Sequence, residues 1–500
     1  MDLSRRIHVV GASGIEGAAL LLYLAGERAL KGVVAHDFST DREAFARSFH
    51  KANTAWDSAE REQVLERIWS LPVDFQLGTD YLRGVDQAEL IFASQNWFNY
   101  PANRPALDHA VAAGAELAGI LDLALDLFPG RRVTVTGSNG KSTTAAIIGH
   151  LLEASVGPGT SVLRSGNDRS RQASLNELEQ ASAKDLAVWE VSNRHLRDRA
   201  VAGDVAVLTN ITPNHIEDHG SWDAYVAAKS RLVLAPGGGG HAVLSAVDPC
   251  SRQITDQVRG TDATTWLFGA PPLPGSGDGH CWISDGMALL QLPGDDNCLE
   301  IGPVSALPLL GEHNLLNLQA ALCAVAACGF TDPTALSTAF ATAAALPGRL
   351  ELVAEEAGVR WVYDIQATTA PAAAAGIAAI AGGRPSIVLL IGGEDKGMDF
   401  SDMAEAAASS CYRVLALPGT GADAFLAALD GRIDVEHCDD LDGALCRARV
   451  VARPGDTVLL SPGCAFFFSK YIDGGASFAV RVQSVLAPAS PNAPSRQEPT

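Results

Sequence analysis

The sequence lacks several features that would place it outside the cytoplasm. It has nine cysteines among 500 residues and no pair with C-x-x-C spacing, which argues against a disulfide framework or a zinc site and fits a reducing compartment. No apolar run approaches the length that spans a bilayer. The N-terminal residues lead directly into an apolar strand without the hydrophobic core of a signal peptide. We therefore expect a cytoplasmic protein without membrane insertion.

Positive charge is also scarce. Lysine and arginine total 37 against 58 acidic residues, so the net charge is −21. A surface of this sign repels the phosphates of nucleic acids, which argues against a nucleic-acid partner. An acidic substrate must instead meet a few focused positive sites. The length of 500 residues exceeds what one core holds, so several domains are expected.

The most informative segment is RRVTVTGSNGKSTT at residues 131–144. It has the pattern of a buried strand, a glycine-rich turn and a helix start, which together hold phosphate. Lys141 adds a positive charge, and a hydroxyl of Ser142 or Thr143 can complete a Mg²⁺ shell. The spacing departs from the common Walker form, because Val135 stands where the first glycine would fall. ATP is the expected ligand, and the alternative is a tight turn with a surface lysine. The predicted nucleotide-binding residues of this loop are Gly137, Ser138, Asn139, Gly140, Lys141, Ser142 and Thr143.

Residues 1–128 alternate short apolar strands with alanine-rich helices, which predicts a Rossmann-like α/β domain. Its first strand leads into a glycine turn at residues 11–17, and its second strand ends on Asp37. The glycine spacing is G-x-x-G-x-x-G and not the dinucleotide pattern G-x-G-x-x-G. An NAD-dependent dehydrogenase is therefore an alternative that this domain alone suggests, and another nucleotide fits equally well.

Residues 129–345 form a second predicted α/β domain, which begins with the phosphate-binding segment. Two of its later strands end in polar tips at Glu190 and Asn210, and ligands of open α/β sheets lie beyond such strand ends. The strand and helix pattern restarts in residues 346–487, which predicts a third α/β domain. The proline-rich tail at residues 488–500 is expected to be disordered.

Three polar residues beyond the loop have suitable chemistry. Glu190 ends a strand where such folds place an acid that holds Mg²⁺, and the alternative is a surface carboxylate. His215 follows the strand tip at Asn210, although a lone histidine is more often structural. Lys229 follows two alanines on a helix, where a close-packed face would demand a partner or a modification. On an exposed face Lys229 would simply be solvated.

Together these segments resemble the Mur ligase family, the ATP-dependent enzymes that add amino acids to the peptidoglycan precursor. The matching motifs are T-G-x-N-G-K-S-T at residues 136–143, Glu190, N-x-x-x-x-H at 210–215, Y-x-x-A-K at 225–229 and G-x-H-N-x-x-N at 311–317. The resemblance extends over nearly the whole chain. It implies a three-domain fold with a central P-loop ATPase domain.

The resemblance also implies a site with two Mg²⁺ ions. One ion would lie near Glu190 and the hydroxyl of Ser142 or Thr143, and a carbamylated Lys229 would hold the other, with His215 completing the metal shell. The expected catalytic residues are Lys141, Glu190, His215 and Lys229. Further contacts to ATP are expected from Asn314, Arg349 and Asp364.

The flanking domains are most similar to the family members that join glutamate to UDP-N-acetylmuramoyl-L-alanine. This similarity implies that the first domain binds the UDP-sugar and that the third domain binds the amino acid. The expected substrate contacts are Ser13, Ile15, Asp37, Ser94, Asn167, Thr368, Lys396, Ser461 and Phe468. The implied reaction passes through an acyl phosphate and yields an amide, ADP and phosphate. The partners are thus a UDP-sugar-linked carboxylate and an amino acid, and the chain is expected to act as a monomer.

Four departures from the family pattern leave the substrates open. They are Asp168-Arg169 in place of Ile-Gly after Gly166-Asn167, Gln366 in place of a lysine, the run Phe466-Phe467-Phe468, and Ser192-Asn193-Arg194-His195 in place of a serine pair and a glutamine. L-Glutamate, another amino acid or a different carboxylate in a secondary pathway are alternatives. A nucleotide-binding protein without turnover is another.

Overall fold

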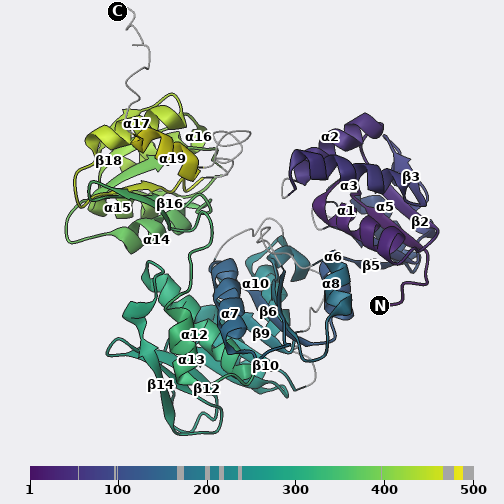
Figure 1. Ribbon diagram of the computed structural model, residues 1–500, viewed down its shortest axis with the longest axis horizontal. Helices are drawn as coiled ribbons and strands as arrows, with labels where there is room; N and C mark the ends of the chain where they lie inside the picture. Colours follow the sequence, from purple (N-terminus) through teal and green to yellow (C-terminus); the bar gives the residue numbers. More distant parts are fainter. Residues whose placement is uncertain are drawn as a thin grey trace, which may run out of the picture. The chain divides into compact units, whose positions relative to one another are not determined.

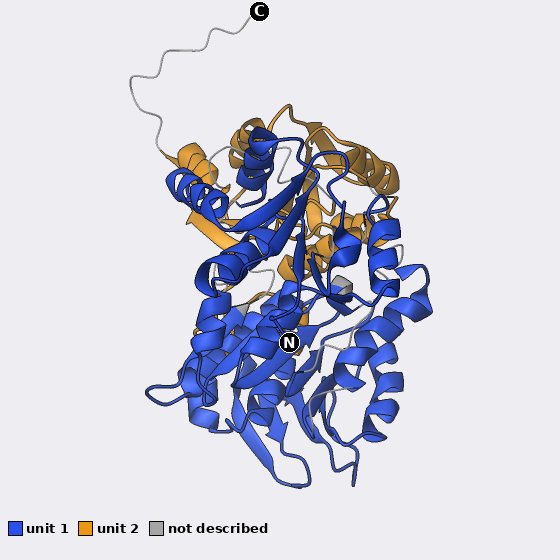
Figure 2. Ribbon diagram, turned by 90° about the vertical axis from the view of Figure 1, so that its right-hand side faces the viewer, with its two compact units in different colours: residues 1–304, 317–340 blue, residues 305–316, 341–500 orange. Residues whose placement is uncertain are grey.

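The computed structural model describes residues 1–53, 56–94, 97, 100–165, 174–196, 203–212, 219–234, 239–395, 397–464 and 478–487. These residues contain three sheets and divide into two compact units. Unit 1 comprises residues 1–304 and 317–340, and unit 2 comprises residues 305–316 and 341–500 (Figure 2). Among the described residues, no helix is both long and apolar enough to cross a membrane.

The first sheet has five parallel strands in the order β3-β2-β1-β4-β5, of which β2, β3 and β5 are labelled in Figure 1. The order reverses at β1, and ligands of open α/β sheets bind outside the carboxyl ends of the strands at such a point. The strands are β1 (Ile7–Val10), β2 (Val33–Asp37), β3 (Val73–Leu77), β4 (Leu90–Ala93) and β5 (Glu116–Ala118). The helices are α1 (Ile15–Leu21), the π-helix η1 (Leu22–Glu27), α2 (Arg42–Ala52), α3 (Ser58–Ser70), the 3₁₀ helix η2 (Val85–Gln87), α5 (Arg104–Ala112) and α6 (Ile120–Leu127).

The second sheet has nine strands in the order β14-β13-β12-β11-β10-β9-β6-β8-β7. Its strands are parallel from β7 to β12, and β13 and β14 run antiparallel to their neighbours. The strands are β6 (Arg131–Thr136), β7 (Val162–Ser165), β8 (Leu186–Glu190), β9 (Val205–Leu208), β10 (His241–Ser245), β11 (Thr264–Phe268), β12 (Gly279–Ser284), β13 (Met287–Gln291) and β14 (Cys298–Pro303). The central strands β8 and β9 are buried along their whole length, which explains their apolar sequences.

The helices of this second region follow its strands closely. They are α7 (Lys141–Ser155), α8 (Leu175–Gln180), η3 (Asn193–Leu196), α10 (Trp222–Leu234), α11 (Pro249–Arg259), η4 (Val304–Ala306), α12 (Glu312–Ala327) and α13 (Pro333–Phe340). The boundary between the two units falls within α12, because residues 305–316 belong to unit 2.

The third sheet has six strands in the order β15-β16-β20-β17-β18-β19, and only β15 is antiparallel to its neighbour. The strands are β15 (Glu351–Glu356), β16 (Val359–Tyr363), β17 (Ile387–Ile391), β18 (Cys411–Ala416), β19 (Asp434–His437) and β20 (Thr457–Leu460). The helices are α14 (Ala370–Ile380), α15 (Ser401–Ser410), α16 (Thr420–Leu429), α17 (Leu441–Val451) and α19 (Phe478–Leu486). The predicted α/β class with mostly parallel sheets is confirmed. The predicted domain boundaries stay predictions, and the tail at residues 488–500 lies outside the described residues.

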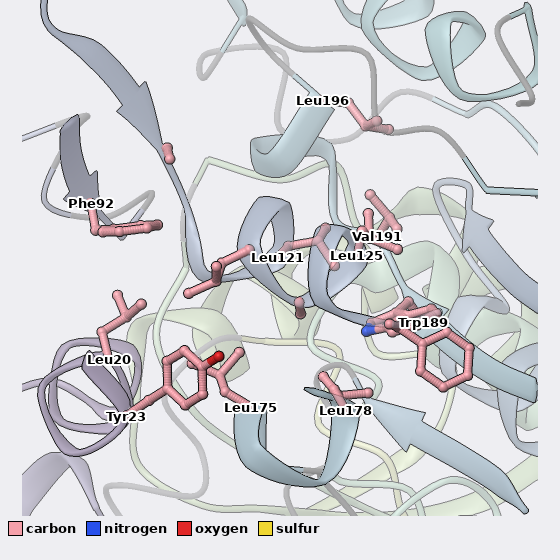
Figure 3. Close-up of a cluster of buried hydrophobic side chains, with 14 of the residues drawn as sticks. Leu20, Tyr23, Phe92, Leu121, Leu125, Leu175, Leu178, Trp189, Val191 and Leu196 are labelled. Atoms are coloured by element: carbon pink, nitrogen blue, oxygen red, sulfur yellow. The ribbon is translucent and has the colours of Figure 1, made fainter. Parts of the chain in front are cut away.

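Within unit 1, one hydrophobic cluster joins the first region to the second (Figure 3). Leu20 and Tyr23, from α1 and η1, belong to the same cluster as Leu178 of α8 and Trp189 of β8. The Tyr23 hydroxyl donates to Glu179 Oε2 at 2.8 Å. The burial of these large side chains is the main source of stability at this junction.

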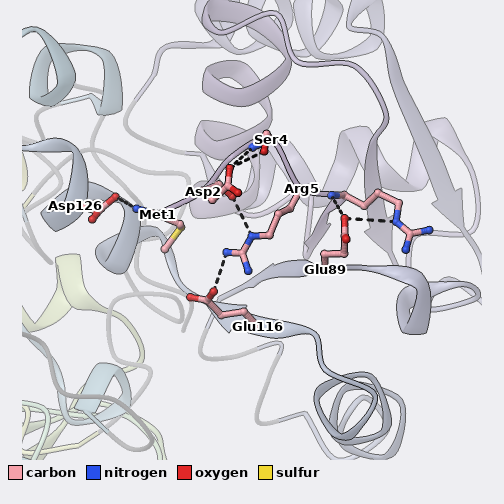
Figure 4. Close-up of polar contacts among 8 residues, drawn as sticks. Met1, Asp2, Ser4, Arg5, Glu89, Glu116 and Asp126 are labelled. Atoms are coloured by element: carbon pink, nitrogen blue, oxygen red, sulfur yellow. Dashed lines mark hydrogen bonds and ion pairs between the residues drawn. The ribbon is translucent and has the colours of Figure 1, made fainter.

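Polar contacts hold the N-terminal segment on unit 1 (Figure 4). The α-amino group of Met1 pairs with Asp126 of α6, and Arg5 Nη2 donates to Glu116 Oε2 of β5 at 2.7 Å. Exposed ion pairs of this kind contribute about 0–1 kcal/mol each. They orient the segment before β1 more than they stabilise the fold.

Candidate active site

The phosphate loop, residues 137–144, connects β6 to the start of α7 and depends on two glycines. Gly137 has φ +149° and Gly140 has φ +80°, conformations that side chains disfavour. A Cβ atom on Gly137 would lie 1.9 Å from Thr209 Oγ1, and one on Gly140 would lie 2.4 Å from Asn317 Oδ1. Both the backbone conformation and the packing therefore require glycine here.

The tip of strand β9 holds the phosphate loop in place. Asn139 N donates to Asn210 Oδ1 at 2.9 Å, and Asn210 Nδ2 donates to Asn139 O at 3.1 Å. Thr209 Oγ1 also donates to Asn139 O at 2.6 Å, and Ser138 N donates to Asn210 O at 2.9 Å. These bonds fix the loop before any ligand arrives, which reduces the cost of ordering it on binding.

Helix α10 holds the phosphate loop from another direction. The Tyr225 hydroxyl is hydrogen-bonded to Ser138 Oγ at 2.8 Å. Lys229 Nζ donates to Gly137 O at 2.7 Å and lies 4.9 Å from the centre of the Tyr225 ring. Lys229 is only 1% exposed, so the alternative of a solvated surface lysine is wrong.

The buried position of Lys229 changes its acidity. Burial lowers the pKa of Lys229 well below its ordinary value, the nearby Lys141 cation lowers it further, and Glu190 acts in the opposite direction. Loss of the proton leaves an amine with a free electron pair, the form that reacts with electrophiles. The site therefore contains a lysine suited to covalent modification.

Ser142 and Glu190 form the part of the site that fits a metal ion. Ser142 Oγ donates to Glu190 Oε2 at 2.6 Å, and Glu190 is buried at the end of β8. A hydroxyl and a carboxylate are oxygen ligands of the kind that Mg²⁺ prefers, with waters and substrate phosphates completing its shell. Lys141 Nζ donates to Gly137 O at 3.1 Å and to Ser138 O at 3.0 Å. Over the described part of the chain, no group of three or more histidine, cysteine or acidic side chains converges to hold a metal.

A histidine that departs from the family pattern lies close to Glu190 in sequence. His195 Nδ1 accepts hydrogen bonds from Ser192 Oγ at 3.0 Å and from Ser192 N at 3.3 Å. Burial lowers the pKa of His195 to about 4, although Glu190 acts in the opposite direction. The ring is therefore neutral at pH 7, and because Nδ1 accepts, its proton lies on Nε2.

In the first region, Asp37 organises the turn that follows β1. Its two carboxylate oxygens accept hydrogen bonds from Ser13 N at 2.9 Å and from Ser39 N and Oγ at 3.0 and 2.7 Å. Asp37 is fully buried, so in this conformation it positions the turn. Ile15 opens α1 beside Ser13, and Ser94 follows the last residue of β4. The predicted substrate contacts of these residues stay predictions.

In unit 2, Asp364 and Ser461 form a buried pair. Ser461 Oγ donates to Asp364 Oδ2 at 2.8 Å, and Leu350 N donates to Asp364 Oδ1 at 3.2 Å. Burial raises the pKa of Asp364 to about 7, although these hydrogen bonds and Arg349 lower it. Thr368 is exposed, and Asn314 Nδ2 donates to Leu310 O at 2.7 Å.

The structure thus assembles the predicted residues of each unit separately. In unit 1, Glu190 and Lys229 lie against the phosphate loop, which itself contains Lys141 and Ser142. The predicted site residues Asn167, His215, Lys396 and Phe468, and the departures at Asp168-Arg169 and Phe466-Phe467-Phe468, lie outside the described residues. Thr209, Tyr225 and Asn317 were missed as site residues, although Asn317 Oδ1 accepts from Thr144 Oγ1 at 3.2 Å. Tyr225 and Asn317 lie within the matched motifs and Thr209 directly precedes one of them, and this was the only available signal.

Two stretches of the chain match known domains. Residues 135–325 match the Mur ligase middle domain, and residues 348–464 match the glutamate ligase domain of the Mur ligases. The chain belongs to the Mur ligase family. As a member of this family it is an ATP-dependent ligase that forms amide bonds.

Similar proteins include two named UDP-N-acetylmuramoylalanine–D-glutamate ligase. The protein from Roseiflexus sp. strain RS-1 is 33% identical over 479 residues, which cover 93% of this chain and 100% of the relative. The protein from Pelotomaculum thermopropionicum is 32% identical and covers 84% of this chain and 89% of its own length.

Solved structures with a similar fold include the UDP-N-acetylmuramate–alanine ligase of Thermotoga maritima. It has a TM-score of 0.56 at 14% identity and covers 96% of this chain and 98% of its own. A pseudomurein peptide ligase type C from Methanothermus fervidus has a TM-score of 0.52 at 17% identity and covers 91% of this chain and 96% of its own. These similarities support the Mur ligase fold.

Proposed function

We propose that the chain joins the carboxylate of UDP-N-acetylmuramoyl-L-alanine to the amine of D-glutamate, with ATP converted to ADP and phosphate, in peptidoglycan precursor synthesis. The observation that carries this proposal is the name of its relatives: the Roseiflexus protein called UDP-N-acetylmuramoylalanine–D-glutamate ligase matches over its whole length at 33% identity. The phosphate loop, with Glu190 and Lys229 beside it, supports the ATP half of the reaction.

In this proposal the chain activates a carboxylate by phosphorylation. The substrate carboxylate attacks the γ-phosphorus of ATP, and the resulting acyl phosphate is attacked by the amine of glutamate, with release of phosphate and a proton. Lys141 and the amides of the phosphate loop would hold the transferred phosphoryl group, which gathers negative charge in the transition state. Mg²⁺, when bound, would neutralise charge on the phosphate oxygens, and Ser142 and Glu190 would be its protein ligands.

Lys229 and His215 would complete the ATP-binding half of the site. Lys229 is buried beside Gly137 and within range of the Lys141 and Glu190 charges. Reaction of its neutral amine with carbon dioxide would form a carbamate and release a proton, and the new carboxylate would supply oxygen ligands for a second Mg²⁺. His215 would contribute to the same metal shell.

The third domain would bring the amino acid to the acyl phosphate. Thr368, Lys396, Ser461 and Phe468 are its proposed contacts to glutamate. Contacts from Asn314, Arg349 and Asp364 to ATP belong to the same proposal. In the first domain, Ser13, Ile15, Asp37 and Ser94 would bind or position the UDP-sugar, and Asn167 of the central domain would contact it. We further propose that the enzyme is a cytoplasmic monomer.

A coupled assay tests the proposed function. Purified chain, MgATP and UDP-N-acetylmuramoyl-L-alanine are mixed separately with D-glutamate and L-glutamate, and phosphate release and product mass are measured. We expect release and an amide product with D-glutamate. Product with L-glutamate only would reverse the stereochemical assignment, and product with another amino acid would replace glutamate. Absence of turnover with every acceptor would favour a nucleotide-binding protein without catalysis.

A further inference from the structure

An exposed aromatic pair lies at the edge of the first sheet. Phe38 is 55% exposed and stacks on Trp97, with ring centres 4.9 Å apart and an angle of 27° between the rings. Phe38 directly follows β2, and Trp97 lies in the connection that follows β4. The two side chains therefore come from segments that leave the same edge of the sheet. We call this pair the aromatic shelf.

The aromatic shelf is held by buried groups beneath it. Asn103 is fully buried, and its Nδ2 donates to Trp97 O at 2.7 Å. The Tyr81 hydroxyl donates to the amide oxygen of Asn103, and the Tyr81 ring contacts Trp97 edge-on at 5.8 Å. These contacts fix Trp97 and leave Phe38 exposed on top of it. An exposed ring on a fixed support loses little freedom when a flat ligand stacks on it.

The shelf also lies against the glycine turn of residues 11–17. A Cβ atom on Gly11 would lie 2.4 Å from Trp97 Nε1, so the indole fits only because residue 11 is glycine. The turn and the shelf share the carboxyl edge of β1, β2 and β4, where the strand order of the sheet reverses. Ligands of open α/β sheets bind at this edge. Asp37, next to Phe38, accepts hydrogen bonds from Ser13 and Ser39 and so positions the turn beside the shelf.

We propose that Phe38, supported by Trp97, stacks on the pyrimidine base of the UDP-linked substrate. This inference rests on the proposed function, which supplies a UDP-sugar as the ligand of the first domain. A base has an apolar face and a polar edge, so it can cover the exposed ring while its edge and the ribose stay in contact with water. Stacking of a base on one aromatic side chain changes binding by roughly 5- to 150-fold.

Calorimetry of UDP binding to the full chain tests the shelf. Phe38→Ala removes the stacking surface and is expected to weaken UDP binding roughly tenfold or more. Phe38→Tyr keeps the ring and should bind UDP like the unchanged protein, whereas Phe38→Leu keeps apolar bulk without a ring and should resemble Phe38→Ala. Val111→Ala, which truncates another exposed apolar side chain of the same region, is the matched control and should leave UDP affinity unchanged.

Two further measurements separate the possible failures. ADP binding with Mg²⁺ reports on the central domain and should be the same in all variants, and thermal unfolding should be nearly unchanged because Phe38 is exposed. If the unchanged protein binds UDP and Phe38→Ala binds it equally well, the shelf proposal is overturned while the proposed function stands. If the unchanged protein binds no UDP at millimolar concentration, the proposed substrate fails, and the shelf proposal fails with it.

Discussion

The turn of residues 11–17 and the phosphate loop both join a strand to a helix, but the ionisable side chains around them differ. Each follows a parallel strand, contains glycines and leads into a helix. The first turn is organised by Asp37 and contains Glu16, whereas the phosphate loop contains Lys141 and contacts Lys229. Glycine spacing therefore predicts the shape of such a turn, whereas the ionisable side chains around the turn indicate which ligand the turn can bind.

The two turns also differ in what their polar groups contact. In the first turn, the amide of Ser13 donates to Asp37, and the amides of Gly11, Ala12 and Gly14 donate to backbone carbonyls. In the phosphate loop, Ser138 and Asn139 are held by Tyr225 of α10 and by Asn210, which follows β9, while Lys141 and Ser142 supply a cation and a hydroxyl. The cation and the hydroxyl therefore favour phosphate and metal binding at the phosphate loop rather than at the first turn.

The largest expected effect is the loss of the cation from the phosphate loop. Lys141→Ala removes the charge that would stabilise the transferred phosphoryl group, and we expect kcat to fall at least about 10³-fold. The rate of phosphate release at saturating ATP measures this fall in kcat. Lys184→Ala, at an exposed lysine of the same region, is the control and should retain full activity. If Lys141→Ala kept more than about a tenth of the normal rate, the loop would not stabilise phosphoryl transfer.

A large but partly reversible effect is expected at Lys229. Lys229→Ala should lower kcat roughly 10²- to 10³-fold, because the proposed carboxylate is lost, and added formate should restore part of the rate. Lys229→Met keeps most of the buried volume and should unfold at nearly the normal temperature, yet it should be equally inactive. Retention of full activity by either variant would show that the modified lysine is not needed.

The phosphate loop could be predicted from sequence because its glycines, lysine and hydroxyls are contiguous. The same holds for Glu190, which marks the end of an apolar strand. Asn317 could not be assigned, because it meets Gly140 only after two distant segments fold together. Asp37 was predicted as a substrate contact, and its burial and internal hydrogen bonds became visible only in the structure.

The aromatic shelf shows the same limit. Phe38 and Trp97 follow two different strands, and the sheet order brings them together. Neither residue belongs to a glycine or acid pattern, so a search for motifs passes over both. Parallel sheets gather distant residues at their carboxyl edge, and sequence patterns identify those edges more readily than the side-chain pairs that form there.

A moderate effect on stability should distinguish the glycines of the two turns. Gly137→Ala places a Cβ atom 1.9 Å from Thr209 Oγ1 at φ +149° and is expected to cost about 2–4 kcal/mol. Gly14 has φ −74°, and a Cβ atom added there would lie 3.3 Å from Gly11 O. Gly14→Ala should therefore lower the free energy of unfolding by less than about 1 kcal/mol. Thermal unfolding of both variants measures the difference. Equal destabilisation would mean that the two turns are equally tight.

The smallest expected effect concerns Glu16, the half-buried acid of the first turn. Burial raises the pKa of Glu16 to about 7 from its ordinary value of 4.5, so the folded state holds the proton more tightly than the unfolded state. Stability should therefore fall as the pH rises from about 4.5 to 7, and Glu16→Gln should remove this loss. We expect Glu16→Gln to be neutral at pH 5 and stabilising by about 1–2 kcal/mol at pH 8, measured by thermal unfolding. Glu66→Gln, at an exposed acid of the same region, should show no such pH dependence. If both variants responded identically to pH, Glu16 would not be the source of the pH-dependent stability.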